Sequence, residues 1–74
     1  MNHLANARAA AVLDLIIAAG GLTLDGYGMG RLRFDAGATS RQVEDIIERL
    51  AADGLIVVEA KAGRVTVEPA GGAR

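Results

Sequence analysis

The stretch from residue 39 to residue 55, TSRQVEDIIERLAADGL, constrains the fold of this chain more than any other part of it. Its apolar residues recur with the spacing of a helix that buries one face, at Val43, Ile46, Ile47, Leu50 and Ala51. Thr39 and Gln42 are spaced as a capping box, in which each side chain accepts a hydrogen bond from the backbone of the other. Gly54 follows the last apolar residues and can adopt the left-handed conformation that ends many helices. The sequence therefore predicts an amphipathic helix with defined ends.

The size and composition of the chain favour one small folded domain. It has 74 residues, of which 51% are hydrophobic, and it contains no cysteine that could form a disulfide or a thiolate metal site. The first residues lack the pattern of a secretory signal, and the longest apolar stretch is too short to cross a bilayer. We therefore expect a cytoplasmic protein. Nine acidic and eight basic residues give a net charge of −1, which is less basic than is usual for a domain that binds nucleic acid.

Residues 4–19 are rich in alanine and leucine and are predicted to form the first helix, which Gly20 and Gly21 end. Along one face of this helix lie Leu4, Ala11, Val12, Leu15, Ile16 and Ala19. Leu13 and Ile17 fall beside that face, so the apolar arc is unusually wide. Either the helix is buried deeply in the monomer, or it also packs against a second copy of the chain. We expect a homodimer whose interface includes Leu4, Leu13 and Ile17.

Residues 22–24 alternate in polarity and are predicted to form a short edge strand before a turn at residues 25–26. The glycines at positions 26, 28 and 30 predict that the next segment begins as a loop. A phosphate-binding loop is disfavoured, because Arg31 stands where the dinucleotide-binding pattern requires its third glycine. We expect a structural loop.

The segment 29–36 fits either a short helix or an extended stretch of chain. In the helical case Leu32 turns inward together with Phe34 or Ala36. Phe34 and Tyr27 are the only aromatic residues. We expect Phe34 in the core and Tyr27 to be a packing residue rather than a platform on which bases stack.

Residues 55–59 and 64–68 are rich in β-branched residues, and the short link at residues 60–63 contains glycine, so the pair is predicted to form an antiparallel hairpin. In the second strand Val65 and Val67 are expected to face the core, while Arg64, Thr66 and Glu68 face water. Pro69 has no N–H to donate and is expected to stop the ladder. The predicted domain therefore spans residues 1–68, and residues 69–74 form a disordered tail.

The order of these elements resembles the winged helix-turn-helix superfamily over residues 4–68. The likeness is strongest from the turn at residues 36–38, through the capped helix, to Gly54-Leu55-Ile56, a run similar to the recognition helix and first wing strand of small bacterial regulators. The resemblance implies an α+β fold with three helices, a small antiparallel sheet and a C-terminal β-hairpin wing. Arg33 stands where the family commonly has a small residue, so we expect the second helix to be distorted or shortened.

The resemblance also implies a small regulator that binds double-stranded DNA. The first turns of the capped helix would enter the major groove, where arginine can pair with guanine and glutamine with adenine. Residues before the turn and on the wing at residues 60–64 would contact the phosphate backbone. The expected DNA-binding residues are Arg31, Arg33, Ser40, Arg41, Gln42, Lys61 and Arg64.

Three acidic residues on the predicted outer face of the capped helix, Glu44, Asp45 and Glu48, favour a different class of function. Near phosphates they would weaken the attraction that basic residues supply. Alternatively, Arg41 and Asp45, and Asp45 and Arg49, form ordinary pairs on a solvated helix face. A protein-interaction module that does not bind DNA is therefore the competing interpretation. One continuous basic face would favour DNA, and its interruption by Glu44 and Asp45 would favour a protein partner.

We expect no enzymatic activity, no cofactor and no metal site. His3 is the only histidine, and the chain has no cysteine to complete a zinc site. Helix capping explains Thr39, and Ser40 has no evident base to activate it. Glu44 and Glu48 share one face of the predicted helix but lack a third ligand.

Overall fold

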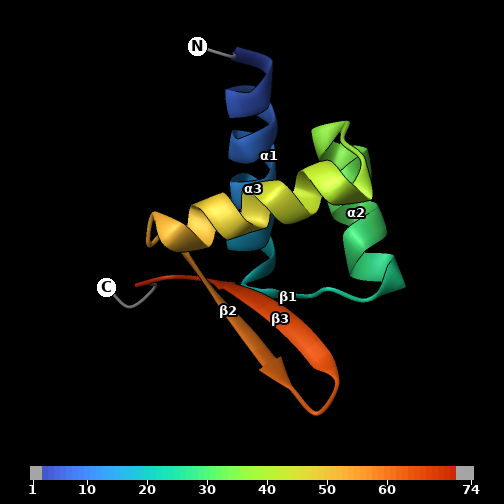
Figure 1. Ribbon diagram of the computed structural model, residues 1–74, viewed down its shortest axis with the longest axis vertical. Helices are drawn as coiled ribbons and strands as arrows, with labels where there is room; N and C mark the ends of the chain where they lie inside the picture. Colours follow the sequence, from blue (N-terminus) through green and yellow to red (C-terminus); the bar gives the residue numbers. More distant parts are fainter. Residues whose placement is uncertain (1–2, 72–74) are drawn as a thin grey trace.

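The computed structural model describes residues 3–71, with side chains described from residue 7 onward. Within these residues the chain forms, in order, α1 (His3–Ala19), β1 (Leu22–Thr23), α2 (Gly26–Ala36), α3 (Ser40–Ala52), β2 (Ile56–Lys61) and β3 (Arg64–Pro69). The strands form one antiparallel sheet in the order β1-β3-β2. The fold is thus α+β, with three helices and a small three-stranded sheet, as the sequence predicted. Figure 1 shows α3 crossing in front of α1, with α2 beside them and the β2–β3 hairpin extending away from the helices.

A single aliphatic core joins the helices to the sheet. Its buried side chains are Val12 and Ile16 of α1, Leu32 of α2, Val43, Ile47 and Leu50 of α3, Ile56 of β2 and Val67 of β3. The largest share comes from α3, whose predicted apolar face is therefore confirmed. In the sheet, Val67 is paired with Leu22 on one side and with Val58 on the other, so these three residues share the face that is turned toward the helices.

The predicted start of α3 is also confirmed. The hydroxyl oxygen of Thr39 accepts a hydrogen bond from the N–H of Gln42 at 3.2 Å, and the N–H of Thr39 donates to Oε1 of Gln42 at 2.9 Å. This reciprocal pair satisfies two of the backbone donors that a helix start leaves free.

Each of the three helices ends at a glycine with positive φ, at Gly20 (+70°), Gly37 (+63°) and Gly54 (+78°). In each case the next residue donates its N–H to the carbonyl oxygen five residues earlier, from Gly21 to Ile16, Ala38 to Arg33 and Leu55 to Leu50. This pairing is the Schellman motif, which returns the chain sharply toward the body of the helix. The predicted ends of the first and third helices are therefore correct.

The prediction of a glycine loop at residues 26–30 is wrong, because these residues form the first turns of α2. The helix is started by Asp25, whose carboxylate accepts a hydrogen bond from the N–H of Gly28 at 2.8 Å. Gly28 is buried, and a Cβ atom at this position would lie against the carbonyl oxygen of Thr23, far inside van der Waals contact. Glycine is therefore needed here for close packing of the helix on β1, and the tertiary contact overrides its low helix propensity.

The inward-facing residues of α2 also differ from the expected ones. Leu32 is buried and Ala36 half-buried, but Phe34 is 88% exposed and Tyr27 is 77% exposed. The predictions that Phe34 lies in the core and that Tyr27 is a packing residue are therefore wrong. The helix is continuous from Gly26 to Ala36, so Arg33 does not shorten it, and the extended alternative is wrong as well.

The hairpin forms as predicted and is longer than expected. β3 ends at Pro69, which is paired with Ile56, and the N–H of Ala70 donates to the carbonyl oxygen of Leu55 at 3.0 Å. The expected tail thus contributes two residues to the sheet region, and its residues 72–74 lie outside the described part of the chain. Val67 is buried, as predicted. Thr66 was expected to face water but is half-buried, because β1 pairs alongside it.

The first helix runs almost over the predicted range, and its buried residues, Val12 and Ile16, both belong to the predicted apolar face. Across residues 3–71, no helix combines the length and the apolar character that crossing a membrane requires.

Substitution of two α2 glycines by alanine should change stability in opposite directions. Gly28→Ala should lower the free energy of unfolding by about 1–3 kcal/mol, because its methyl group would collide with β1. Gly30→Ala should raise it by about 0.5–1 kcal/mol, because a Cβ atom there meets nothing within 4 Å and alanine is the better helix former. Urea denaturation of both variants measures the difference. Equal effects would contradict the proposed approach of α2 to β1.

Truncation of a core leucine should strongly lower the free energy of unfolding. Leu50 is 5% exposed, so Leu50→Ala should lower the free energy of unfolding by about 2–5 kcal/mol. Leu55 is 46% exposed and provides the matched control, for which the same change should cost much less. An unchanged melting temperature in Leu50→Ala would show that the register of α3 is wrong.

Candidate functional site

The first turn of α3 presents three polar side chains to solvent. Ser40, Arg41 and Gln42 are all exposed and directly follow the turn that joins α2 to α3. Oε1 of Gln42 is already engaged by the N–H of Thr39. Reading adenine requires an acceptor and a donor from the same amide, and the capping hydrogen bond occupies one of the two acceptor sites of Oε1 and restrains the orientation of the amide. Arg41 is therefore the residue of this turn best able to recognise a base.

The hairpin tip carries two positive charges side by side. Lys61 and Arg64 are direct partners in the register of β2 and β3, so both project from the same face of the hairpin, and both are exposed. They are joined by Ala62 and Gly63, whose φ values are +54° and +76°. Positive φ at both loop residues is typical of the tight type I′ hairpin turn.

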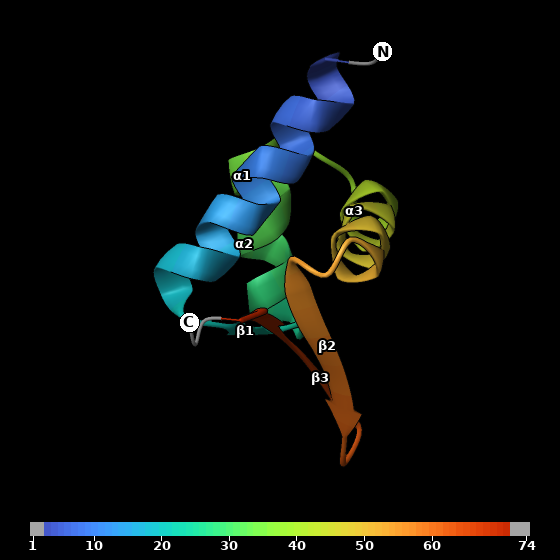
Figure 2. The same ribbon diagram turned by 90° about the vertical axis from the view of Figure 1, so that its left-hand side faces the viewer.

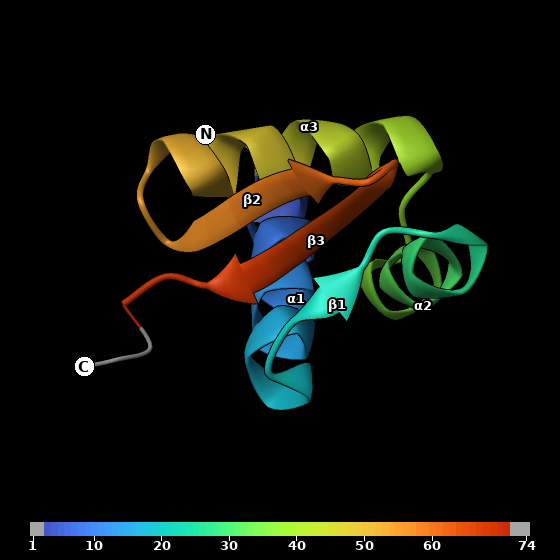
Figure 3. The same ribbon diagram turned by 90° about the horizontal axis from the view of Figure 1, so that it is seen from below.

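The remaining basic candidates, Arg31 and Arg33, lie on α2, and both are exposed. In Figure 2, α3 and the hairpin lie on the side of the molecule opposite α1. In Figure 3 the hairpin runs beneath α3, and its tip lies toward the N-terminal half of that helix. All seven candidate DNA-binding residues are therefore accessible, and those of α3 and the hairpin share one side of the molecule.

The exposed surface of α3 is mixed in charge rather than uniformly basic. Glu44, Asp45 and Glu48 are exposed together with Arg41 and Arg49. Asp45 lies one helical turn after Arg41 and one turn before Arg49, on the face opposite the core. Acidic residues thus interrupt the basic surface of this helix, which is the arrangement expected for a protein partner rather than for DNA.

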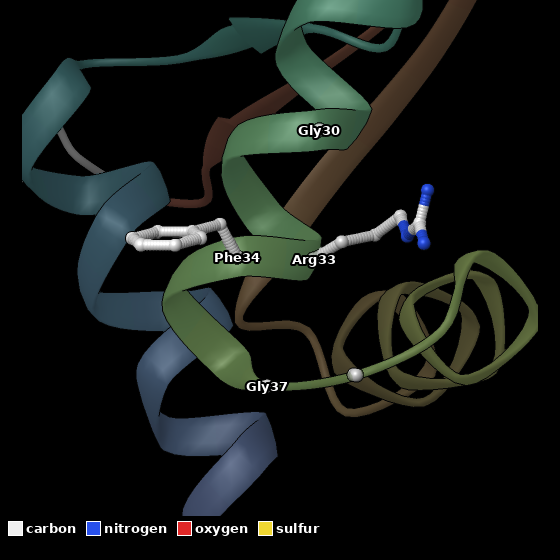
Figure 4. Close-up of a pocket in the computed structure, with 5 residues that line it drawn as sticks. Gly30, Arg33, Phe34 and Gly37 are labelled. Atoms are coloured by element: carbon white, nitrogen blue, oxygen red, sulfur yellow. The ribbon is translucent and has the colours of Figure 1, made fainter.

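A shallow hollow lies on the outer side of α2, at its C-terminal end. Its volume is about 410 Å³, and it is lined by Gly30, Arg33, Phe34, Gly37 and Ala38. Figure 4 shows the side chains of Phe34 and Arg33 pointing away from each other, with the two glycines leaving the helix backbone uncovered above and below them. The hollow combines an apolar surface with one positive charge.

This hollow was not expected from the sequence, in which Phe34 is predicted to lie in the core. A usable signal was present, since Gly28, Leu32 and Ala36 recur every four residues and define one face of a helix. Phe34 and Tyr27 are seven residues apart and fall together on the other face.

The residues expected at a dimer interface differ in their exposure to solvent. Ile17 is 54% exposed and Leu13 is half-buried, while the side chain of Leu4 lies outside the described residues. Ile17 therefore offers apolar surface on α1, and the homodimer stays a prediction.

No protein-family model, curated protein or solved structure matches this chain. Within the part of the chain whose side chains are described, acidic and histidine residues form no group of three able to hold a metal ion. The described surfaces offer charge, hydrogen-bonding groups and apolar contact, and the function is inferred from these.

The hairpin turn can be stabilised without altering its charged residues. Ala62 adopts a left-handed conformation, which costs an L-residue with a Cβ atom about 1–2 kcal/mol. Asparagine tolerates this conformation better, so Ala62→Asn should raise the free energy of unfolding by up to about 1 kcal/mol. Thermal and urea denaturation would detect the change. Ala60→Asn, within β2, is the control and should be destabilising, and the same result for both would argue against the turn geometry.

Proposed function

We propose that the chain is a winged helix-turn-helix domain that acts as a small regulator by binding duplex DNA. In this proposal α3 enters the major groove and the β2–β3 hairpin is the wing. The order of the elements supports it, since α2, a tight turn, α3 and a hairpin follow one another as in that superfamily.

The observation that carries the proposal is the pair of like charges at the hairpin tip. Lys61 and Arg64 lie directly opposite each other, an arrangement that destabilises a hairpin by itself. Folding therefore gains nothing from the pair, whereas a polyanion would be attracted by both charges. Duplex DNA is such a polyanion. A projecting hairpin can contact its phosphates while the neighbouring exposed helix lies in a groove.

The first turn of α3 supplies the specific contacts in this proposal. Its exposed Arg41 can form a bidentate pair with guanine, and Ser40 can donate to a base or a phosphate. Arg31 and Arg33 add phosphate contacts from α2. These few contacts give weak binding per subunit, so a working regulator needs two linked copies, which we place at Leu4, Leu13 and Ile17 of α1.

A second candidate function is supported by the mixed charge of α3. The exposed Glu44, Asp45 and Glu48 suit a protein surface that offers both signs of charge better than they suit phosphates. In this alternative the domain is a protein-interaction module without DNA binding. The two candidates differ in their response to DNA at low salt.

Binding to a mixed pool of duplex DNA at two salt concentrations tests the proposal. Arg41→Ala should cost about 1–3 kcal/mol on the preferred sequence and relax the preference. Lys61→Ala should weaken binding to all sequences and reduce the slope of affinity against salt by about one unit. Glu44→Gln is the opposing control and should strengthen binding, because it removes a negative charge near the phosphates. An absence of binding at low salt, or an unchanged affinity in both basic variants, would favour the protein-interaction module.

A further inference from the structure

Phe34 is the most exposed large apolar side chain of the described surface, at 88%. The core consists of aliphatic side chains, and Phe34 contributes nothing to its packing. Phenylalanine is also a poorer helix former than alanine or leucine, so this position on α2 gains nothing in local stability from it. Neither burial nor helix propensity therefore accounts for an aromatic residue here, and such exposure is typical of contact sites.

The hollow beside Phe34 has the form of a small docking site. Gly30 and Gly37 contribute no side chains to it, and a Cβ atom at either position would meet nothing within 4 Å. An incoming side chain could thus lie over the bare helix backbone between Phe34 and Arg33, which diverge as Figure 4 shows. The volume of about 410 Å³ is enough for one or two large side chains rather than for a folded surface.

The charge of the hollow indicates which kind of partner it can bind. Arg33 is the charged residue among those that line it. The guanidinium of Arg33 is exposed, so the lining carries a positive charge that complements a carboxylate.

We infer that this hollow is a docking site for an acidic, amphipathic segment of another protein. A large apolar side chain of that segment packs on Phe34 and over the glycines, and a neighbouring aspartate or glutamate pairs with the guanidinium of Arg33. This site shares Arg33 with the proposed phosphate contacts of α2, but it lies apart from the contacts of α3 and the hairpin, and it does not rest on DNA binding.

Other occupants fit the hollow less well. A DNA backbone would pair with Arg33 but would leave the ring of Phe34 in water. A second copy of the chain could offer the acids of α3, Glu44, Asp45 and Glu48. However, the exposed residues of α3 include no large apolar side chain that could fill the hollow, and Ile17 of α1, near the exposed Asp14, belongs to the surface that we assign to the homodimer.

Selection from a displayed library of random 12-residue peptides tests the inference. The full chain is the bait, and peptides that bind the Phe34→Ala variant equally well are removed. We expect enriched peptides to combine aspartate or glutamate with a large apolar residue. Their affinity, measured by fluorescence anisotropy, should fall at least about tenfold in Phe34→Ala and in Arg33→Glu.

Tyr27→Ala is the matched control. It also removes an exposed aromatic side chain from α2, at a position that does not line the hollow, so affinity should change less than about twofold. Circular dichroism should show both aromatic variants folded, since neither side chain is buried. Lys61→Ala should retain peptide binding while it weakens binding to DNA, which separates this inference from the proposed function.

Several results would overturn the inference. These are the enrichment of no peptides, the enrichment of basic or neutral peptides, and an equal loss of affinity in Tyr27→Ala and Phe34→Ala. Concentration-dependent association of the chain that Phe34→Ala abolishes would assign the hollow to a second copy. Loss of DNA affinity in Phe34→Ala, without peptide binding to the wild type, would assign it to nucleic acid.

Discussion

Eight buried aliphatic side chains join the three helices and the sheet in one core, and further half-buried apolar residues pack against them. A domain this small has little stability to spare, so each of these side chains carries a considerable share of it. The sharp glycine turns after α1, α2 and α3 are what allow such short segments to return to one core. The core uses no aromatic residue, and the two aromatic residues of the chain are consequently left for the surface.

The parts of the fold that the sequence predicted well are those whose signals are local. The apolar spacing, the Thr39–Gln42 box and Gly54 define α3 within one stretch, and β-branched residues around a short link define the hairpin. The glycine-rich start of α2 was predicted as a loop because its helical form depends on a distant contact, the approach of Gly28 to Thr23. Propensity cannot register that contact, since it exists only when β1 and α2 have already packed together.

The candidate functional residues also differ in whether local sequence patterns predict their placement. Exposure of Ser40, Arg41, Lys61 and Arg64 follows from patterns that the sequence shows directly, and the structure finds all of them accessible. The hollow at Phe34 was missed, because glycine at three positions of residues 26–36 weakens the apolar pattern, although the spacing of Gly28, Leu32 and Ala36 does define the inner side of a helix. The engagement of Gln42 in the helix cap, by contrast, was predicted from its spacing to Thr39, and the hydrogen bond from the N–H of Thr39 confirms it.

Arg33 connects the two surfaces that we propose. It lines the hollow from α2 and belongs, with Arg31, to the basic residues assigned to phosphate contacts. One guanidinium cannot pair fully with a carboxylate and a phosphate at once, so an acidic partner in the hollow would withdraw a phosphate contact from DNA. By linkage, DNA would weaken the partner to the same extent. The loss would be modest, because Arg41, Lys61 and Arg64 remain free to bind DNA, and it would grow smaller as salt screens the phosphate contact. The two ligands would therefore compete in part through a shared charge, without any change in the fold.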